Sequence, residues 1–182
     1  MKSIRLITIA TIVTLPSLFA ETPPLTKLET SAASGNATAQ FELGRAYFRG
    51  DGFDTDKAKA HAWILKSAEQ GNPDAITTMG YFYFQGIVLE KDEAKAIEWF
   101  RKGAEAGSAK SQLNLGLMLR QGKTIPHDNT ESLKWLEMAA STGDTDAVRT
   151  YGQVLFLGDS LTMPDRKKAF PFVLKSAEAG DA

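Results

Sequence analysis

The stretch GNPDAITTMGYFYFQGIVLEKDEAKAIEWFRKGAEAG, from Gly71 to Gly107, decides the fold. Its glycines, its aspartate and its tryptophan recur along the chain with a period of 36 residues: Gly35, Gly71, Gly107 and Gly143; Gly44, Gly80, Gly116 and Gly152; Asp56, Asp92 and Asp128; Trp63, Trp99 and Trp135. The fourth copy is one residue longer, so that Asp165, Phe172 and Gly180 follow their counterparts after 37 residues. A fixed period of this length predicts a repeat architecture.

Each copy predicts two helices. The first begins after a short polar residue that can cap free backbone N–H groups, namely Asn36, Asn72, Ser108 or Asp144. It ends at a glycine suited to a left-handed terminal turn, and the aspartate column then caps the second helix. One such hairpin cannot bury its apolar face, whereas stacked neighbours can. The sequence therefore predicts an all-α fold, an α-solenoid (right-handed superhelix) of antiparallel helix-turn-helix repeats of about 36 residues.

The helix faces follow from the 3.6-residue period. Leu43, Met79, Leu115 and Tyr151 lie on the core stripe of the first helices, and the Gly44 column beside it permits close approach of the partner helix. In the second helices we expect the tryptophan column to lie in the core. Pro171 falls inside the last of these helices, where we expect a kink or a local break.

The predicted division of the chain is a signal peptide over 1–20, a linker with a partial N-terminal capping helix over 21–34, and the solenoid over 35–182. Its repeats cover 35–70, 71–106, 107–142 and 143–179, and a fifth begins at 180. The closing KSAEAGDA (Lys175 to Ala182) thus ends in mid-repeat, and we expect Phe172, Val173 and Ala177 to be partly exposed. This predicts either a longer array or self-association through the uncapped C-terminal end.

The first twenty residues, MKSIRLITIATIVTLPSLFA, have basic Lys2 and Arg5, then an apolar run and a small residue, Ala20, at the expected cleavage point. An uncleaved anchor is the alternative, but the apolar run is short for a membrane span, which needs about twenty residues. Cleavage would leave 182 − 20 = 162 residues and change the net charge from −1 to −3, because two cations are lost. We expect a periplasmic or secreted bacterial protein with no stable membrane insertion after cleavage.

Composition excludes several functions. The near-neutral charge argues against nucleic-acid binding, and the absence of cysteine removes disulfides, thiolate metal sites and cysteine nucleophiles. His61 occupies an apolar column and is expected to pack, whereas His127 beside Asp128 leaves a metal site open as a minor alternative, since Asp128 is already explained as a cap. We expect no enzyme activity, no cofactor and no metal.

The repeat resembles the Sel-1-like repeat, a relative of the tetratricopeptide repeat. The second copy carries the pattern best, in Ala75, Gly80, Tyr83, Gly86, Asp92, Lys95, Ala96, Trp99, Ala104 and Gly107. Leu119 and Leu155 depart from it where tyrosine is usual, and the fourth copy has Phe172 in place of tryptophan. The resemblance implies a scaffold that recruits partner proteins rather than one that transforms substrates.

In a superhelix of the tetratricopeptide type, the first-helix face opposite the core lines a concave groove. Aromatic and arginine side chains, which are enriched at binding hot spots, gather on this face. The predicted partner-binding residues are Phe41, Arg45, Phe48, Arg49, Tyr81, Phe84, Leu117, Arg120, Arg149 and Phe156. Some of these aromatics could instead pack against neighbouring repeats. The main hypothesis is an exported scaffold that binds an unidentified protein or peptide, and the alternatives are a periplasmic inhibitor or immunity-type protein and an envelope enzyme or cell-wall-fragment binder.

Overall fold

The computed structural model describes residues 24–158 and 163–180. These ranges contain nine helices: α1 (Pro24–Ala33), α2 (Ala37–Arg49), α3 (Lys57–Glu69), α4 (Pro73–Gln85), α5 (Glu93–Glu105), α6 (Ala109–Gln121), α7 (Asn129–Ser141), α8 (Thr145–Leu157) and α9 (Arg166–Glu178). The predicted signal peptide, much of the longer fourth loop and the first residues of a fifth repeat lie outside the described residues.

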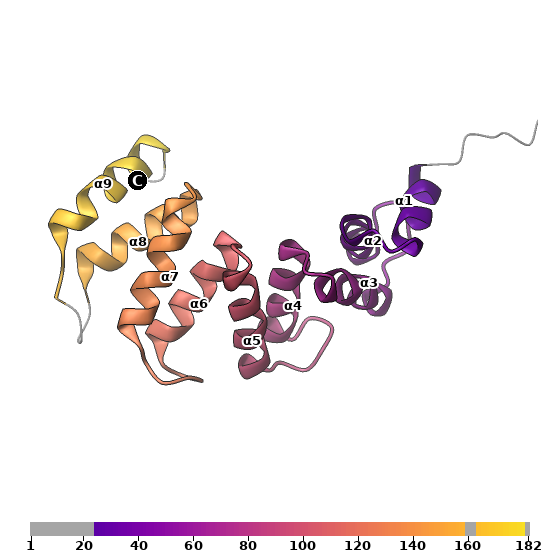
Figure 1. Cartoon of the computed structure of the whole chain (residues 1–182), viewed down its shortest axis with the longest axis horizontal. Coiled ribbons are helices and arrows are strands. Elements are labelled where there is room, and N and C mark those ends of the chain that lie inside the picture. Colours follow the sequence, from indigo (N-terminus) through magenta and orange to yellow (C-terminus); the bar gives the residue numbers. More distant parts are fainter. Residues whose placement is uncertain (1–23, 159–162, 181–182) are drawn as a thin grey trace, which may run out of the picture.

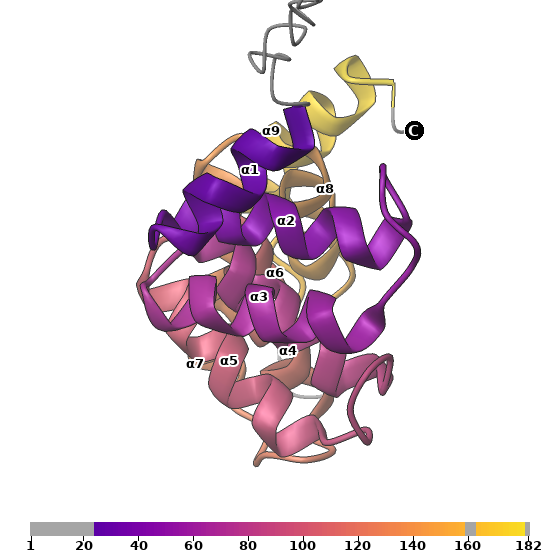
Figure 2. The same ribbon diagram turned by 90° about the vertical axis from the view of Figure 1, so that its right-hand side faces the viewer.

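Each helix packs against the next one along the chain, and the helices form a curved row from α1 to α9 (Figure 1). Seen from the α1 end, the successive pairs lie behind one another (Figure 2). The predicted α-solenoid of helix-turn-helix repeats is confirmed. No helix within 24–158 and 163–180 is both long and apolar enough to span a membrane.

The predicted caps are present at both kinds of helix start. Asn36 Oδ1 accepts a hydrogen bond from the Ala39 backbone N–H over 2.8 Å, and Asp92 Oδ1 accepts one from Lys95 over 3.0 Å. Asp92 also has a pKa below its ordinary value, chiefly because of this bond to the Lys95 backbone. At the C-terminal end of α4, Gly86 takes the left-handed conformation with φ 68°. The turn chemistry of the sequence therefore sets the helix limits.

The glycine column brings the two helices of each pair into close contact. A Cβ atom placed on Gly44 would lie 2.5 Å from Ile64 Cγ1 and 3.0 Å from the Ala60 carbonyl oxygen. Gly80 meets Phe100 and Gly116 meets Leu136 in the same way. The predicted close approach at these glycines is confirmed.

In α3, α5 and α7, the large side chain that is fully buried belongs to the residue after the tryptophan. Ile64, Phe100 and Leu136 are buried, whereas the tryptophans before them are half-buried at the edge of the core. The Lys66 ammonium lies 4.5 Å from the centre of the Trp63 ring, and Lys102 covers Trp99 in the same way. The prediction that the tryptophans fill the core is therefore wrong by one residue. The space above each glycine is filled by the aliphatic or phenyl side chain of the next residue.

Helix α9 runs without interruption through Pro171, so the predicted local break is wrong. Pro171 is exposed, and water can therefore satisfy the carbonyl oxygen that its missing N–H leaves unpaired. In α9 the side chain above Gly152 is that of Phe172, which stands at the tryptophan position of the repeat. Val173, at the position of Leu136, is 42% exposed, whereas Leu136 is 0% exposed. Phe172 is half-buried and Ala177 is exposed, as expected, while self-association through this end stays a prediction.

Ion pairs link second helices of neighbouring repeats. Arg101 Nη1 on α5 lies 2.5 Å from Glu131 Oε1 on α7, and Lys168 Nζ on α9 lies 2.9 Å from Glu137 Oε1 on α7. The hydrogen bond from Arg101 holds the pKa of Glu131 below its ordinary value. These residues occupy equivalent places in successive repeats with the charges reversed, so the same contact is made twice.

Replacing Gly44 by alanine tests the close helix contact. The new methyl group would press on the Ala60 backbone as well as on Ile64. We expect Gly44→Ala to reduce the free energy of unfolding by about 1–2 kcal/mol, because overpacking costs about 1–3 kcal/mol and alanine returns roughly 0.5–1 kcal/mol of helix propensity. The measurement is the urea midpoint followed by circular dichroism.

The matched control is Gly152→Ala, where the nearest atoms are 3.1 Å and 3.3 Å away and the loss should be smaller. Equal urea midpoints for the Gly44 variant and the unsubstituted chain would contradict the close-contact account.

Candidate functional site

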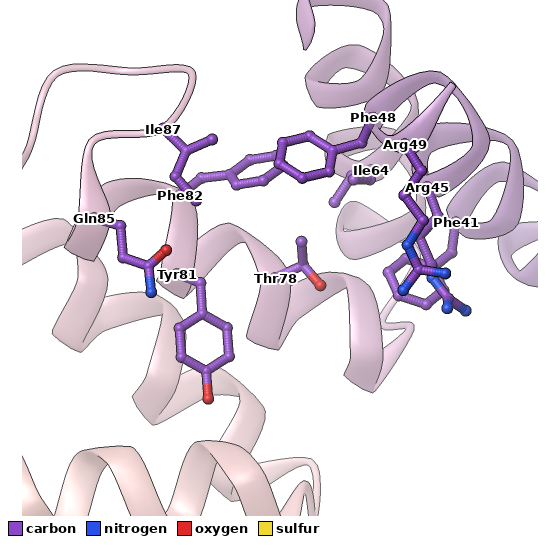
Figure 3. A pocket seen from close by; sticks show the side chains of 10 residues that line it. All are labelled: Phe41, Arg45, Phe48, Arg49, Ile64, Thr78, Tyr81, Phe82, Gln85 and Ile87. Carbon is purple, nitrogen blue, oxygen red and sulfur yellow. The ribbon is translucent and has the colours of Figure 1, made fainter. Parts of the chain in front are cut away.

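A pocket opens between α2 and α4, on the first-helix face (Figure 3). We call it the α2–α4 pocket; its volume is about 370 Å³. The residues lining it are Phe41, Arg45, Phe48, Arg49, Ile64, Thr78, Tyr81, Phe82, Gln85 and Ile87. Five of the ten predicted partner-binding residues are among them, all from the first two repeats: Phe41, Arg45, Phe48, Arg49 and Tyr81.

One side of the pocket is apolar. The Phe48 and Phe82 rings lie side by side, with centroids 5.7 Å apart and planes tilted by 32° (Figure 3). Ile64 and Phe41 are buried and close the pocket toward the core, while Ile87 contributes from the turn after α4. A side chain inserted here would therefore meet rigid hydrocarbon already anchored in the core.

The other side is cationic. The Arg45 guanidinium lies 5.5 Å from the centre of the Phe41 ring and pairs with Glu42 over 2.9 Å. Arg49 is exposed one turn further along α2, and within the described chain no ion pair or hydrogen bond engages its side chain. Arginines that lie on an aromatic wall can bind a carboxylate while remaining partly desolvated.

A second hollow of about 280 Å³ adjoins the first, and we call it the basic hollow. It shares Phe41, Arg45, Arg49, Thr78 and Tyr81 with the α2–α4 pocket and adds Asp74, Thr77 and Lys110. Asn114 Nδ2 donates a hydrogen bond to the Tyr81 hydroxyl oxygen over 2.7 Å, which fixes the ring at the boundary between the two hollows. The two hollows form one continuous surface from α2 to α6.

Phe48, Phe84 and Phe156, predicted partner-binding residues that occupy one column of the repeat, do not form one surface. Phe84 is exposed beside a different hollow of about 200 Å³, where the Lys91 ammonium lies 5.7 Å from its ring centre. Phe156 is exposed at the end of α8 and is covered in part by the Arg166 guanidinium, 5.3 Å from its ring centre. Only Phe48 of this column faces the α2–α4 pocket.

The remaining predicted residues hold parts of the fold. Arg120 Nη2 donates to the Gly158 carbonyl oxygen over 2.8 Å, and its Nη1 lies 3.3 Å from Asn129 Oδ1, so this side chain joins α6 to the end of α8. Arg149 pairs with Asp146 on its own helix. Leu117 is half-buried against the core of the last two repeats.

The sequence-based selection missed five lining residues: Ile64, Thr78, Phe82, Gln85 and Ile87. Thr78, Phe82 and Gln85 lie on the same helix as the selected Tyr81, so a wider helical stripe would have included them. Ile64 belongs to the core column, and Ile87 lies beyond the glycine that ends α4. No periodic signal marks a turn residue that folds back over its own helix.

His61 and His127 both contact other parts of the fold, and neither belongs to a metal-binding cluster within the described residues. Burial lowers the pKa of His61, which favours the neutral ring, and that ring lies 6.3 Å from Phe82. The His127 Nδ1 atom lies 2.7 Å from the Arg120 carbonyl oxygen. Within the described ranges, no group of three or more histidine, aspartate or glutamate side chains is placed to hold a metal ion.

The profile of the Sel1 repeat matches residues 37–72, 73–108, 109–144 and 147–181. A Sel1 repeat protein from Oxalobacter formigenes is 31% identical, with a TM-score of 0.78 over 85% of this chain and 63% of that one. A protective antigen of uropathogenic Escherichia coli strains is 35% identical, with a TM-score of 0.81 over 87% of this chain and 34% of that one.

A putative Sel1 repeat protein from Klebsiella pneumoniae, at 24% identity, has a TM-score of 0.59 over 84% of this chain and 73% of its own length, and it supports the fold alone. The chain thus spans less than two thirds of the length of the Oxalobacter and Escherichia proteins. No curated protein matches significantly.

Arg120→Ala tests the assignment of this side chain to the fold rather than to the pocket. We expect faster hydrogen exchange of the backbone amides at the end of α8, because the Gly158 carbonyl oxygen loses its guanidinium donor. The matched control is Arg49→Ala, an exposed arginine at the equivalent end of α2, which should leave exchange in α8 unchanged. Unaltered exchange in the Arg120 variant would contradict the structural role.

Proposed function

Because this chain belongs to the Sel1 repeat family, we propose that it binds a partner protein or peptide on its first-helix face, at the α2–α4 pocket. Sel1 repeat proteins generally act as protein–protein interaction scaffolds. The observation that carries the proposal is the pocket itself, which combines apolar walls with two arginines at the boundary of a continuous surface. Aromatic and arginine anchors around a desolvated pocket are the usual centre of a binding interface.

We further propose that the chain acts by binding alone. The Sel1 repeat scaffold is generally non-catalytic. Among the described residues that line the pocket none is a carboxylate, so the lining lacks the pair of carboxyl groups that a cell-wall hydrolase would use. An inhibitor or immunity-type protein would use the same surface, and the identity of the bound partner separates it from a general scaffold.

Photo-crosslinking tests the place of binding. Gln85 lies at the pocket, whereas Glu98 is exposed on the second helix of the same repeat. We expect para-benzoylphenylalanine in place of Gln85 to crosslink one partner in the producing bacterium, while the same group in place of Glu98 does not. Phe48→Ala should weaken the Gln85 crosslink, because it removes one aromatic wall.

The circular dichroism spectrum of the Phe48 variant serves as the control for folding. Equal crosslinking from both positions, or an unchanged Gln85 crosslink in the Phe48 variant, would contradict binding at this pocket.

We propose that the chain is exported and acts in the periplasm or outside the cell. The support is the order of Lys2, Arg5, an apolar run and Ala20 in the first twenty residues. We expect protein recovered from the periplasmic or extracellular fraction to begin at Glu21, as read by mass spectrometry. Ala20→Phe should leave the longer chain uncleaved, because signal cleavage requires a small residue there. A mature chain that still begins at Met1 in the cytoplasmic fraction would refute export.

A further inference from the structure

We propose that the α2–α4 pocket and the basic hollow together select an extended acidic segment that carries one large apolar side chain. This inference rests on the proposed function and names the chemistry of the partner. The apolar side chain would enter the α2–α4 pocket, and carboxylates of neighbouring positions would lie over the basic hollow.

The shape of the surface supports a single apolar anchor. The pocket of about 370 Å³ is closed below by buried Phe41 and Ile64 and walled by the stacked Phe48 and Phe82 rings. A leucine, methionine or phenylalanine side chain would bury most of its surface there, and each buried methylene is worth about 0.8 kcal/mol. The hollow beside Phe84 is smaller, at about 200 Å³, and the basic hollow, at about 280 Å³, is lined by charged and hydroxyl side chains as well, so the α2–α4 pocket is the better place for the apolar side chain.

The charges around the pocket are unequal. Arg45, Arg49 and Lys110 line the basic hollow, and Asp74 is the one carboxylate among its lining residues. The whole chain carries a net charge of −1, so these cations are a local concentration and not a property of the entire surface. An acidic segment would be attracted to this part of an otherwise slightly acidic protein.

Arg45 and Arg49 can pair with a ligand at little cost in free energy. The Arg45 pair with Glu42 spans one helical turn and is more than a third exposed on both sides, and such surface pairs contribute little. Arg49 engages no side chain within the described ranges. A ligand carboxylate could therefore exchange for Glu42 on Arg45 while it forms a new pair with Arg49.

Tyr81 adds a hydrogen-bond donor at the boundary of the two hollows. Its hydroxyl oxygen accepts from Asn114 Nδ2, so within the described chain the hydroxyl proton remains to donate toward a bound acceptor. Tyr81 also packs edge-on against Phe100, with ring centroids 5.3 Å apart, and this contact keeps the hydroxyl in position. Tyr81 lines both hollows, and its hydroxyl, held beside α6 by Asn114, would donate to a carboxylate or a peptide carbonyl of the segment.

The arrangement also restricts the spacing in the ligand. The two hollows share five residues, so the apolar side chain and the first carboxylate must be close in the partner's sequence. In an extended segment, side chains two positions apart point the same way, about 7 Å from each other. The structure therefore assigns the preference to an apolar residue with an acidic residue within two positions.

Fluorescence anisotropy with synthetic peptides tests this chemistry directly. The probe is fluorescein-labelled Gly-Ser-Phe-Asp-Glu-Asp-Ser-Gly, and two controls replace either Phe by Ser or the three acids by their amides. We expect the purified chain to bind the probe at least about tenfold more tightly than either control, because each control removes one of the two recognised groups. Binding should weaken as salt is raised, since the charges are solvent-accessible.

Charge reversal supplies the specific variant. Arg49→Glu should weaken the probe about tenfold or more and should strengthen binding of a peptide in which lysines replace the three acids. Lys134→Glu, an exposed cation on α7 away from both hollows, is the matched control and should bind the probe as the unsubstituted chain does. Equal binding of all peptides, equal binding of the serine-substituted acidic control, or an unchanged affinity in the Arg49 variant would overturn the inference.

The outcomes separate this inference from the proposed function. A partner that crosslinks at Gln85 but is not displaced by an excess of the acidic probe would refute the acidic, apolar chemistry and leave the scaffold function in place. If Gln85 crosslinks no partner in the cell but the purified chain binds the probe specifically, the proposed function is refuted and the peptide chemistry of the surface stands. If the probe displaces the crosslinked partner and Arg49→Glu abolishes that competition, both stand.

Discussion

The structure depends on the close contact between the two helices of each repeat at a glycine. Where Gly44, Gly80 or Gly116 faces its partner helix, no side chain separates the backbones, and one large residue of the second helix fills the space above it. The same contact repeated every 36 residues gives each hairpin nearly the same geometry. Neighbouring hairpins then stack with a constant step, and the row curves as a solenoid. The contact also fixes the rotation of the two helices within a pair, and with it the face that each helix turns outward.

Because of this constraint, the four copies share the same helix packing but differ in the side chains on their outer faces. The core columns of large side chains remain apolar in all four copies, although these side chains differ in size, since they must fit the glycine contact. Opposite the core, the first helices carry different residues in each copy, and α2 and α4 bring aromatic side chains and two arginines to one hollow. In the later copies the arginines are used internally, Arg120 toward Gly158 and Arg149 toward Asp146. The surface that we propose for binding, with its mixed apolar and basic character, thus lies in the N-terminal half of the solenoid.

The fold could be predicted almost completely from the sequence, and the site in part. Caps and terminal glycines act within one helical turn, so Asn36 or Gly86 can be assigned without knowing distant contacts. The periodic pattern placed Phe41, Arg45, Phe48, Arg49 and Tyr81 on one face, where the structure brings them together. It could not reveal that Arg120 reaches Gly158, because that contact joins residues 38 positions apart. Nor could it show that Ile64 rather than Trp63 fills the core, because both lie within the same apolar stripe and differ only in helix rotation.

The arginines of α2 connect the folding constraint to recognition. Arg45 lies on the ring of Phe41, a residue buried by the packing of α2 against its neighbours, so the guanidinium is held where the core places the ring. In the unbound chain Glu42 partly neutralises it, and this exposed pair is weak enough to be exchanged for a ligand carboxylate. The apolar pocket alone would accept many hydrophobic segments, and the cations alone would attract many acidic ones. Placed side by side on two neighbouring first helices, they would require both features at once, and this is how the proposed scaffold would discriminate among partners.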